Sequence, residues 1–419
     1  MSIFSLAWHS LNNRRLTAAL AMIALALSVT LFLGVERLRI SAKESFTNTI
    51  SGTDLIVGAR AGNVQLLLYS VFRMGNATSN ISMESLERIA ARDEVAWVVP
   101  ISLGDSHKSY RVMGTSNDYF EYYRYRNKRA LEFAAGHRFE DLFDVVIGSE
   151  AATNLGYRLG SEIIISHGIG PIGGQAHDTM PFKITGILER TGTPVDRTIH
   201  VSLEALEAVH LGWQNGGQSL SRKITSEQAR TMMLAPSAVT AALVGTKSRF
   251  GIFKVQRFIN TYKGEPLTAV LPGVALQELW SLVSIAETAL ATVSSMVVLT
   301  AILGMVTMIL GTLNERRQEI AILRSIGAHP RTIFALLMIE AALLALGGIV
   351  LGTALLYLLL VTLSPWVEQS FGLYLAIGLP TLYEIQLMLA ILVIACLVGS
   401  IPAMRAYRQS LSDGMSVNR

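Results

Sequence analysis

Four long runs of uncharged, mostly apolar residues stand out along the chain. They cover residues 16–35, 288–314, 341–367 and 385–404. The hydrocarbon core of a bilayer is about 30 Å thick, and an α-helix of about 20 apolar residues crosses it. Four runs of this length in one chain are not typical of the buried helices of a soluble protein. The pattern therefore predicts four transmembrane helices, at residues 16–40, 277–313, 332–363 and 384–405.

The first run admits two interpretations, a cleavable signal peptide or a retained anchor. Its apolar stretch is longer than the roughly 7–15 residues of a signal-peptide core, and no A-x-A-like cleavage site follows it. We therefore expect this run to stay in the protein as the first transmembrane helix.

The segment between the first two predicted spans has a different pattern. Residues 41–276 contain no spanning run, and short β-branched segments such as 53–59 and 95–101 alternate there with helical ones. Before the helical segment 82–92, Ser82 is placed to act as the N-cap. The pattern predicts a mixed α+β extracytoplasmic domain with two lobes.

Three parts of this domain carry more specific expectations. Residues 64–72 are apolar but too few to span a bilayer, so they predict a buried strand, with a surface for lipid or an acylated cargo as the alternative. Residues 211–237 predict a flexible insertion. The Gly-rich segment with His167, His177 and Asp178 is typical of a solvated hairpin tip. A metal-binding loop is the less favoured interpretation, because this spacing matches no recognised ligand pattern.

Composition supports a membrane protein. Residues are 51% hydrophobic and only 16% charged, whereas soluble domains carry about 25% charged residues. The net charge of +4 and the lack of a basic stripe interleaved with aromatics give no indication of nucleic-acid binding. The single cysteine, Cys396, excludes an intrachain disulfide.

Basic residues in the short loops predict the orientation. The loop between the second and third predicted spans contains Arg316, Arg317, Arg324 and Arg331, whereas residues 364–383 contain no Lys or Arg. Because cytoplasmic loops are enriched in Lys and Arg, residues 314–331 are expected in the cytoplasm and 364–383 outside. Both the N-terminal segment 1–15 and the tail 406–419 are then cytoplasmic.

A few polar positions near the spans do not follow this simple pattern. Arg37, Arg39 and Lys43 lie just outside the first span, where a long translocated domain makes local charge less decisive. Glu287 enters the second span, and both a functional carboxylate and one that reaches the interface remain open. The small residues around Gly348 in the third span predict close helix packing within one subunit.

The loop between the second and third spans is itself amphipathic. On a helix, Ile320, Leu323 and Ile326 recur at the helical interval and form an apolar face. A loop that only fixes topology explains the arginines but not this face or the glutamates 315 and 319. Such a helix is suited to a groove on a soluble partner.

The same loop also contains charged residues that can pair and a glycine and a proline that can end a helix. Arg317 and Arg324 are seven residues apart and share one side of the helix, and Glu319 can pair with Arg316. Gly327 predicts the helix end, and Pro330 predicts a turn into the third span.

The sequence lacks the common motifs of nucleotide-binding and hydrolytic enzymes. No G-x-x-x-x-G-K-[ST] phosphate loop occurs, so ATP hydrolysis would need another subunit. No H-E-x-x-H or G-x-S-x-G motif occurs either. We therefore expect a chain that is not an enzyme, without a catalytic, metal or cofactor site of its own.

The order of these elements resembles that of one family. One span, a large extracytoplasmic domain, three further spans and a charged helix between the second and third is the plan of the FtsX-like permeases, the MacB, LolC/LolE and FtsX group. Residues 315–328, ERRQEIAILRSIGA, are similar to the family's E-R-x-x-E-I-x-x-L-R-x-I-G-A block. Residues 399–408, GSIPAMRAYR, look like its P-A-x-R-A ending, and residues 145–203 resemble the MacB-like periplasmic core domain. Residues 51–80 depart from the best-known members, which leaves the subfamily open.

The resemblance implies the permease subunit of a type VII (mechanotransmission) ABC transporter in the bacterial inner membrane. It implies a separate cytoplasmic ABC ATPase, which binds ATP and Mg, and a second permease copy or a related permease. The implied further partners are a periplasmic adaptor, an outer-membrane duct or a lipoprotein, together with membrane lipid. The implied ATPase-coupling residues are Glu315, Arg316, Arg317, Glu319, Ile320, Leu323, Arg324 and Gly327.

Within this family the sequence leaves the function open. The favoured interpretation is ATP-driven periplasmic work, such as export or extraction of a peptide, lipoprotein or lipid. The alternative is an FtsX-like regulator that switches a periplasmic enzyme and transports nothing. A weaker alternative, a transporter linked to metal supply, depends on His167 and His177 alone. The cargo, the ATPase and the choice between homodimer and heterodimer are not readable from the sequence.

Overall fold

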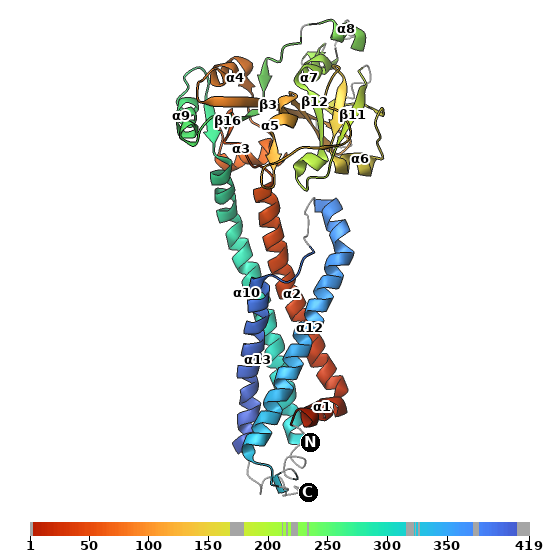
Figure 1. Cartoon of the computed structure of the whole chain (residues 1–419), viewed down its shortest axis with the longest axis vertical. Helices are drawn as coiled ribbons and strands as arrows, with labels where there is room; N and C mark the ends of the chain where they lie inside the picture. Colours follow the sequence, from red (N-terminus) through yellow and green to blue (C-terminus); the bar gives the residue numbers. More distant parts are fainter. Residues whose placement is uncertain are drawn as a thin grey trace. The chain divides into compact units, whose positions relative to one another are not determined.

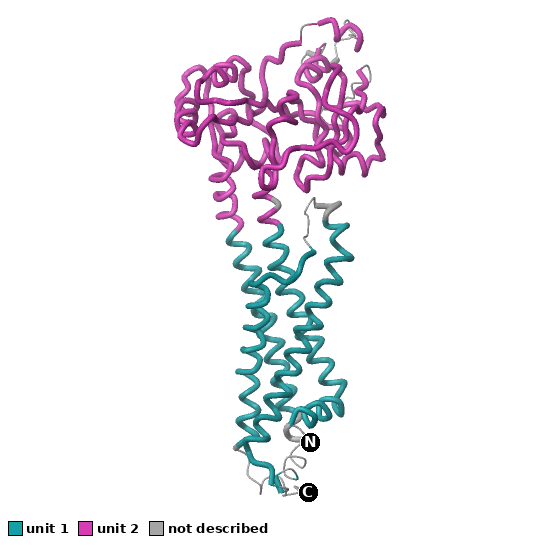
Figure 2. Tube along the Cα trace, in the orientation of Figure 1, with its two compact units in different colours: residues 1–41, 284–370, 374–419 teal, residues 42–283, 371–373 magenta. Residues whose placement is uncertain are grey.

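The computed structural model describes residues 3–167, 180–211, 213, 214, 217, 218, 225–232, 234–315, 322, 324, 325, 327–371 and 377–408. The chain divides into two compact units (Figure 2). The first, here called the membrane unit, comprises Met1–Ser41, Ser284–Ser370 and Tyr374–Arg419. The second, the sheet domain, comprises Ala42–Val283 and Phe371–Leu373.

Long helices build the membrane unit (Figure 1). They are α1 (Ile3–Asn13), α2 (Arg15–Asn48), α10 (Pro272–Glu315), α12 (Pro330–Phe371) and α13 (Leu382–Arg408). Among the described residues, four stretches are long and apolar enough to cross a membrane: Arg15–Asn48, Pro272–Gly311, Pro330–Val367 and Leu382–Tyr407. The predicted four membrane helices are thereby confirmed.

The helices extend beyond the predicted spans. At 1.5 Å per residue, the 44 residues of α10 measure about 66 Å, roughly twice the thickness of a hydrocarbon core. A loop was expected from residue 364, but α12 continues through Pro365 to Phe371. Proline removes one helical hydrogen bond, and the surrounding apolar sequence still favours helix in a membrane protein. The N-terminal segment, for which only a location was predicted, forms helix α1.

The membrane helices are apolar on both their inner and outer faces. The buried core takes residues from all four long helices, among them Leu25, Ile302, Leu344 and Ala395. Other large apolar side chains on the same helices are exposed, including Leu20, Leu299, Leu358 and Leu397. A helix that is apolar all round is typical of a membrane span, since its outer face contacts lipid.

Small residues allow α12 to approach α2 closely. A Cβ atom on Gly352 would lie 2.6 Å from the Ala26 carbonyl oxygen, and one on Gly348 would lie 2.8 Å from the Leu25 side chain. The Thr30 hydroxyl donates a hydrogen bond to the Gly352 carbonyl at 2.9 Å. The glycines therefore serve helix packing within the chain, as predicted from their spacing.

The sheet domain is a mixed α+β structure, as predicted. Its strands are β1 (Leu55–Ala59), β2 (Ile81–Ser82), β3 (Val95–His107), β4 (Tyr110–Thr115), β5 (Arg124–Tyr125), β6 (Arg129–Ala130), β7 (Phe133–Gly136), β8 (Asp144–Ile147), β9 (Glu162–Ile163), β10 (Ser166–His167), β11 (Phe182–Leu188), β12 (Thr198–Ser202), β13 (Trp213–Gln214), β14 (Gly217–Gln218), β15 (Ala238–Val239), β16 (Ala241–Thr246) and β17 (Leu267–Val270). Its helices are α3 (Asn63–Ser70), α4 (Met83–Ala90), α5 (Asp118–Tyr122), α6 (Ser149–Leu155), α7 (Leu203–His210), α8 (Ser226–Arg230) and α9 (Arg249–Asn260), with a 3₁₀ turn at Pro194–Arg197.

One sheet runs through the whole domain. Eleven of the described strands belong to it, in the order β17-β1-β16-β3-β4-β12-β8-β11-β7, with β10 paired to β3 and β9 to β11. Its pairs are antiparallel except for β12 with β4 and β11 with β8. Helices α4 and α9 lie at one end of the domain, and α6 and α7 lie at the other (Figure 1). The two expected lobes are therefore the two ends of a continuous sheet.

Local sequence patterns located several of these elements. Residues 53–59 and 95–101 contain β1 and the first half of β3. Ser82 is the N-cap of α4, because its Oγ accepts a hydrogen bond from the Ser85 N–H at 3.2 Å. In the expected insertion 211–237, the structure describes two short strands, β13 and β14, and helix α8.

The prediction of a buried strand within residues 64–72 is wrong. This stretch contains helix α3, which buries Leu66, Leu67 and Tyr69. Burial was predicted correctly, but a short apolar run carries no period that separates a buried helix from a buried strand.

His200 on β12 is completely buried in the sheet domain. Its ring lies 5.4 Å from the Tyr119 ring and 5.8 Å from the Phe120 ring, centroid to centroid. Burial lowers its pKa from 6.5 to about 3, with a further contribution from the positive charge of Arg73. The residue is therefore a neutral imidazole in the folded protein.

This histidine should make the sheet domain sensitive to acid. Its contribution to stability is complete above pH 6.5, where the unfolded chain also carries neutral His200, and is lost as the pH falls towards 3. Between pH 6.5 and pH 5 we expect a loss of about 2 kcal/mol from this residue, at about 1.4 kcal/mol per unit. Urea unfolding of the detergent-solubilised chain at the two pH values measures it.

A His200→Leu variant should have a flatter pH dependence than the wild type. His137→Leu is the matched control, since the His137 side chain is about half exposed. An unchanged pH dependence in His200→Leu would contradict the assignment.

Candidate functional site

Only part of the predicted coupling segment belongs to the described structure. Helix α10 ends at Glu315, whose side chain, like the whole of Arg316, Arg317, Glu319, Ile320 and Leu323, lies outside the described residues. Gly327 has a φ of +99° and donates its N–H to the Arg324 carbonyl at 3.0 Å. Helix α12 begins three residues later, at Pro330. The predicted stop at Gly327 and turn at Pro330 agree with this geometry, and the role of the segment stays a prediction.

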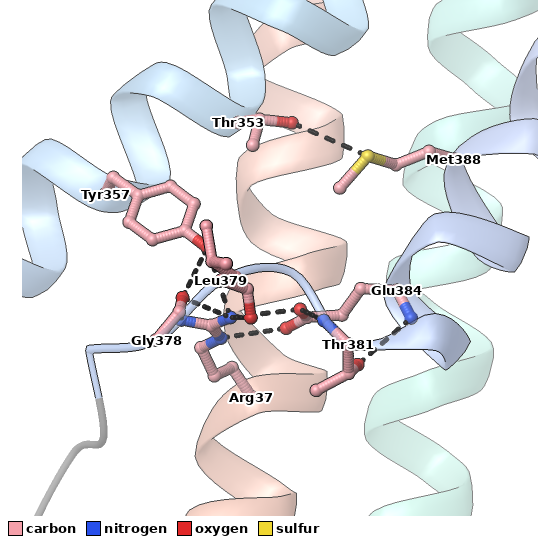
Figure 3. Close-up of polar contacts among 8 residues, drawn as sticks. All are labelled: Arg37, Thr353, Tyr357, Gly378, Leu379, Thr381, Glu384 and Met388. Atoms are coloured by element: carbon pink, nitrogen blue, oxygen red, sulfur yellow. Dashed lines mark hydrogen bonds and ion pairs between the residues drawn. The ribbon is translucent and has the colours of Figure 1, made fainter.

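The strongest polar site of the membrane unit lies where α13 begins. Arg37 of α2 binds Glu384 of α13 through two hydrogen bonds, Nε to Oε1 at 2.8 Å and Nη2 to Oε2 at 3.0 Å (Figure 3). The two side chains are only 9% and 3% exposed. A bidentate contact of this kind fixes both the distance and the orientation of the two groups.

A third helix and a connecting segment complete the site. Arg37 Nη2 lies 3.3 Å from the Tyr357 hydroxyl of α12, and Nη1 lies 3.3 Å from the Gly378 carbonyl. The Tyr357 hydroxyl donates to the same Gly378 carbonyl at 2.6 Å. Figure 3 shows these groups converging on the guanidinium from α12 and from the segment before α13.

Glu384 also starts helix α13. The Thr381 N–H donates to Glu384 Oε2 at 2.8 Å, and the Glu384 N–H donates to Thr381 Oγ1 at 3.2 Å. This reciprocal pair is a capping box. The T-x-x-E signal at 381–384 stands before an apolar run in the sequence, and it was missed there. Its partner Arg37 had been noted only as an exception to the charge rule.

A second group of ion pairs involves Arg39, another of the basic residues that did not follow the charge rule. Arg39 Nη2 lies 2.6 Å from Glu36 Oε1, and Arg39 Nη1 lies 3.6 Å from Glu287 Oε2 of α10. Glu287 is thus paired with an arginine of a neighbouring helix, and its two interpretations, a functional carboxylate and one that reaches the interface, both stay predictions. Arg37 and Arg39 are both paired with carboxylates.

The Arg37–Glu384 site holds helices in place and does not carry out a reaction. A buried ion pair gains little net stability, because both charges lose their hydration, but separating its partners leaves an uncompensated charge in a low dielectric. The site therefore resists any movement that would draw α2 away from the start of α13.

The sheet domain contains a polar pocket of about 260 Å³ beside β3 and α7. His210 Nε2 lies 3.6 Å from Asp105 Oδ2 there, and hydrogen bonding to this carboxylate raises the pKa of His210. Within the described residues no group of three His, Cys, Asp or Glu side chains is placed to hold a metal ion. The backbone of His167 belongs to β10, whereas its side chain, His177 and Asp178 lie outside the described residues.

Comparisons with known proteins agree on two segments. Residues 18–247 match the model of the MacB-like periplasmic core domain, and residues 291–411 match that of the FtsX-like permease C-terminal region. A search of curated proteins finds no match.

Among solved structures, the chain is similar to the periplasmic region of MacB from Actinobacillus actinomycetemcomitans, with 10% identity and a TM-score of 0.34, covering 55% of this chain and 94% of that one. It is also similar to the extracellular domain of the noncanonic ABC-type transporter YknZ from Gram-positive bacteria, with 14% identity and a TM-score of 0.30, covering 52% of this chain and 98% of that one.

Breaking the ion pair on one side should destabilise the membrane unit. We expect Arg37→Met and Glu384→Gln each to cost about 3 kcal/mol, the range found when one partner of a buried pair is removed. The double variant should cost less than the sum of the two. The single cysteine, Cys396, lies half-buried in α13, so its reaction with a fluorogenic thiol dye during heating reports on this helix.

Arg39→Gln is the control for this experiment. Its ion pair with Glu36 is about one-third exposed on the arginine side, so its loss should cost less than about 1 kcal/mol. Additive effects of Arg37→Met and Glu384→Gln would show that the two side chains are not coupled.

Proposed function

The chain belongs to the FtsX-like permeases with a MacB-like periplasmic core domain, and we propose that it turns ATP binding and hydrolysis by a separate ATPase into movement of that domain. ABC-transporter-type permeases of this family are membrane subunits that work with a cytoplasmic ATPase and are generally not catalytic themselves. The ATP and Mg would be bound by that partner.

The continuity of α10 is the observation that supports this proposal most directly. It is one helix of 44 residues. Its first residues, up to Val283, belong to the sheet domain, and its last residue, Glu315, begins the charged segment. A helix without a break transmits a displacement along its axis better than a jointed connection does. A pull on the segment 315–327 would therefore reach the sheet domain through α10.

The distribution of arginines supports one orientation of the protein in the membrane. Arg316, Arg317, Arg324 and Arg331 would place the charged segment and both termini in the cytoplasm. The sheet domain would then be periplasmic in a multi-pass protein of the inner membrane. A second copy or a related permease would complete a pair that binds two ATPases.

In this arrangement the sheet domain would act on a substrate in the periplasm. Side chains from all four long helices pack in the apolar core of the membrane unit. By analogy with the family, we expect no substrate path through it. Export or extraction of a peptide, lipoprotein or lipid would therefore take place at the sheet domain. An FtsX-like regulator would use the same movement to switch an enzyme, and the two differ in the partners that co-purify.

Charge reversal in the segment tests the coupling. We expect Glu319→Arg and Arg324→Glu each to reduce stimulation of the partner ATPase by about tenfold or more, because each replaces an attractive contact by a repulsive one across the docking interface. The measurement is ATPase activity of the reconstituted complex, together with co-purification of the ATPase.

Arg331→Glu is the matched control, since it makes the same change of charge in the first turn of α12, outside the proposed contact residues. Full ATPase stimulation and complex formation in both reversal variants would show that residues 315–327 are not the coupling segment.

A further inference from the structure

A second pocket of the sheet domain adjoins the one that holds Asp105 and His210. It has a volume of about 270 Å³ and lies between the segment that follows α3 and strands β3 and β4. Its lining includes Gly75, Asn76, Ala77, Asn80, Leu103 and Arg111. Polar groups and apolar surface therefore both face this pocket.

Arg111 of β4 is a cation at this pocket with no carboxylate bound to it among the described residues. Its Nη1 donates to Asn76 Oδ1 and its Nη2 to the Gly75 carbonyl, both at 2.9 Å. Both acceptors are neutral, so the positive charge is uncompensated. Arg111 is partly buried, and this burial lowers the pKa of its guanidinium.

A second guanidinium lies beneath the same segment. Arg73 stands two residues before Gly75 and adopts a left-handed backbone with φ +60°, which a non-glycine side chain rarely takes. Its Nη2 lies 2.7 Å from Met113 Sδ, a weak acceptor, and its buried Nε and Nη1 have no hydrogen-bond partner among the described residues. Met113 and Arg111 are two residues apart on β4 and so share one face of the sheet.

Two further polar side chains lie close to Arg73. Met113 lies directly opposite His200 of the neighbouring strand. Tyr119 and His200 are both completely buried, and the positive charge of Arg73 acts to lower the pKa of each. Both side chains are neutral, so no carboxylate is bound to Arg73 among the described residues.

We propose that this part of the sheet domain binds the phosphate of a small organic ligand, with Arg111 lining the pocket and Arg73 adding positive charge nearby. A guanidinium presents several N–H donors in a plane that matches the oxygens of a phosphate. The volume and the apolar part of the lining leave room for a short organic group beside the anion. This site is independent of the coupling segment and of its ATPase.

The acidic group of the adjoining pocket does not oppose an anion here. Asp105 lies in that pocket, which shares Asn80, Leu103 and Gly104 with this one. Its carboxylate is paired with His210 at 3.6 Å, so its charge is at least partly matched.

Calorimetric titration of the full chain in a non-ionic detergent tests the proposal. The probes are inorganic phosphate, glycerol phosphate and dihexanoyl phosphatidylglycerol. We expect saturable binding of at least one probe, weakened about tenfold or more by Arg111→Gln and by Arg73→Gln, because each removes charged hydrogen bonds. Arg111→Lys keeps the charge but loses the planar donor pair, so it should bind with intermediate affinity.

Arg60→Gln is the control, since Arg60 is an exposed arginine of the same domain. Circular dichroism establishes that each variant is folded, and if Arg73→Gln is not, the two Arg111 variants decide. Binding of the soluble probes would assign a free phosphate ester, and binding of the lipid probe alone would assign a lipid headgroup. The proposal would be overturned if the wild type showed no saturable binding, or if both Arg111 variants bound the probe with the affinity of the wild type.

Discussion

The buried ion pair between Arg37 and Glu384 constrains how the helices of the membrane unit can move. It joins α2 to the first turn of α13, and Tyr357 adds α12 to the same site. Neither charge can leave the other without losing its compensation in a low dielectric. Because Glu384 also caps α13, the start of that helix is fixed by the same carboxylate. Movement of α2 must therefore carry α12 and α13 with it or break this site.

Close packing between the helices adds to this constraint on their movement. Close packing of Gly348 and Gly352 against α2 leaves little room for the two helices to slide. Helix α10 is held to α2 near the same level by the more exposed contact between Arg39 and Glu287. Separating an exposed ion pair costs little, because water solvates both charges, whereas separating a buried pair leaves an uncompensated charge in a low dielectric. We therefore expect α10 to move relative to α2 more readily than α12 and α13 do, as the proposed transmission through α10 requires.

The sequence predicted the features that depend on local pattern. Apolar run length located the membrane helices, and strands such as β1 and β3 followed from β-branched segments between turn residues. The helix of residues 64–72 was missed because a short apolar run has no decisive period. The partners Arg37 and Glu384 are 347 residues apart, so no local pattern joins them, although the T-x-x-E cap at 381–384 was readable. The environment of the Arg73 guanidinium was equally hidden, since it depends on which residues β4, α5 and β12 place around it.

The central claim is that this chain works as the membrane subunit of an ATP-driven complex. Affinity purification of the tagged chain from its native membranes in mild detergent, with partners identified by mass spectrometry, tests it most directly. The account predicts a cytoplasmic ABC ATPase in stoichiometric amounts, accompanied by an adaptor, a duct or lipoproteins if the complex exports or extracts. Recovery of the intact chain with its periplasmic partners and without any ATPase would contradict it.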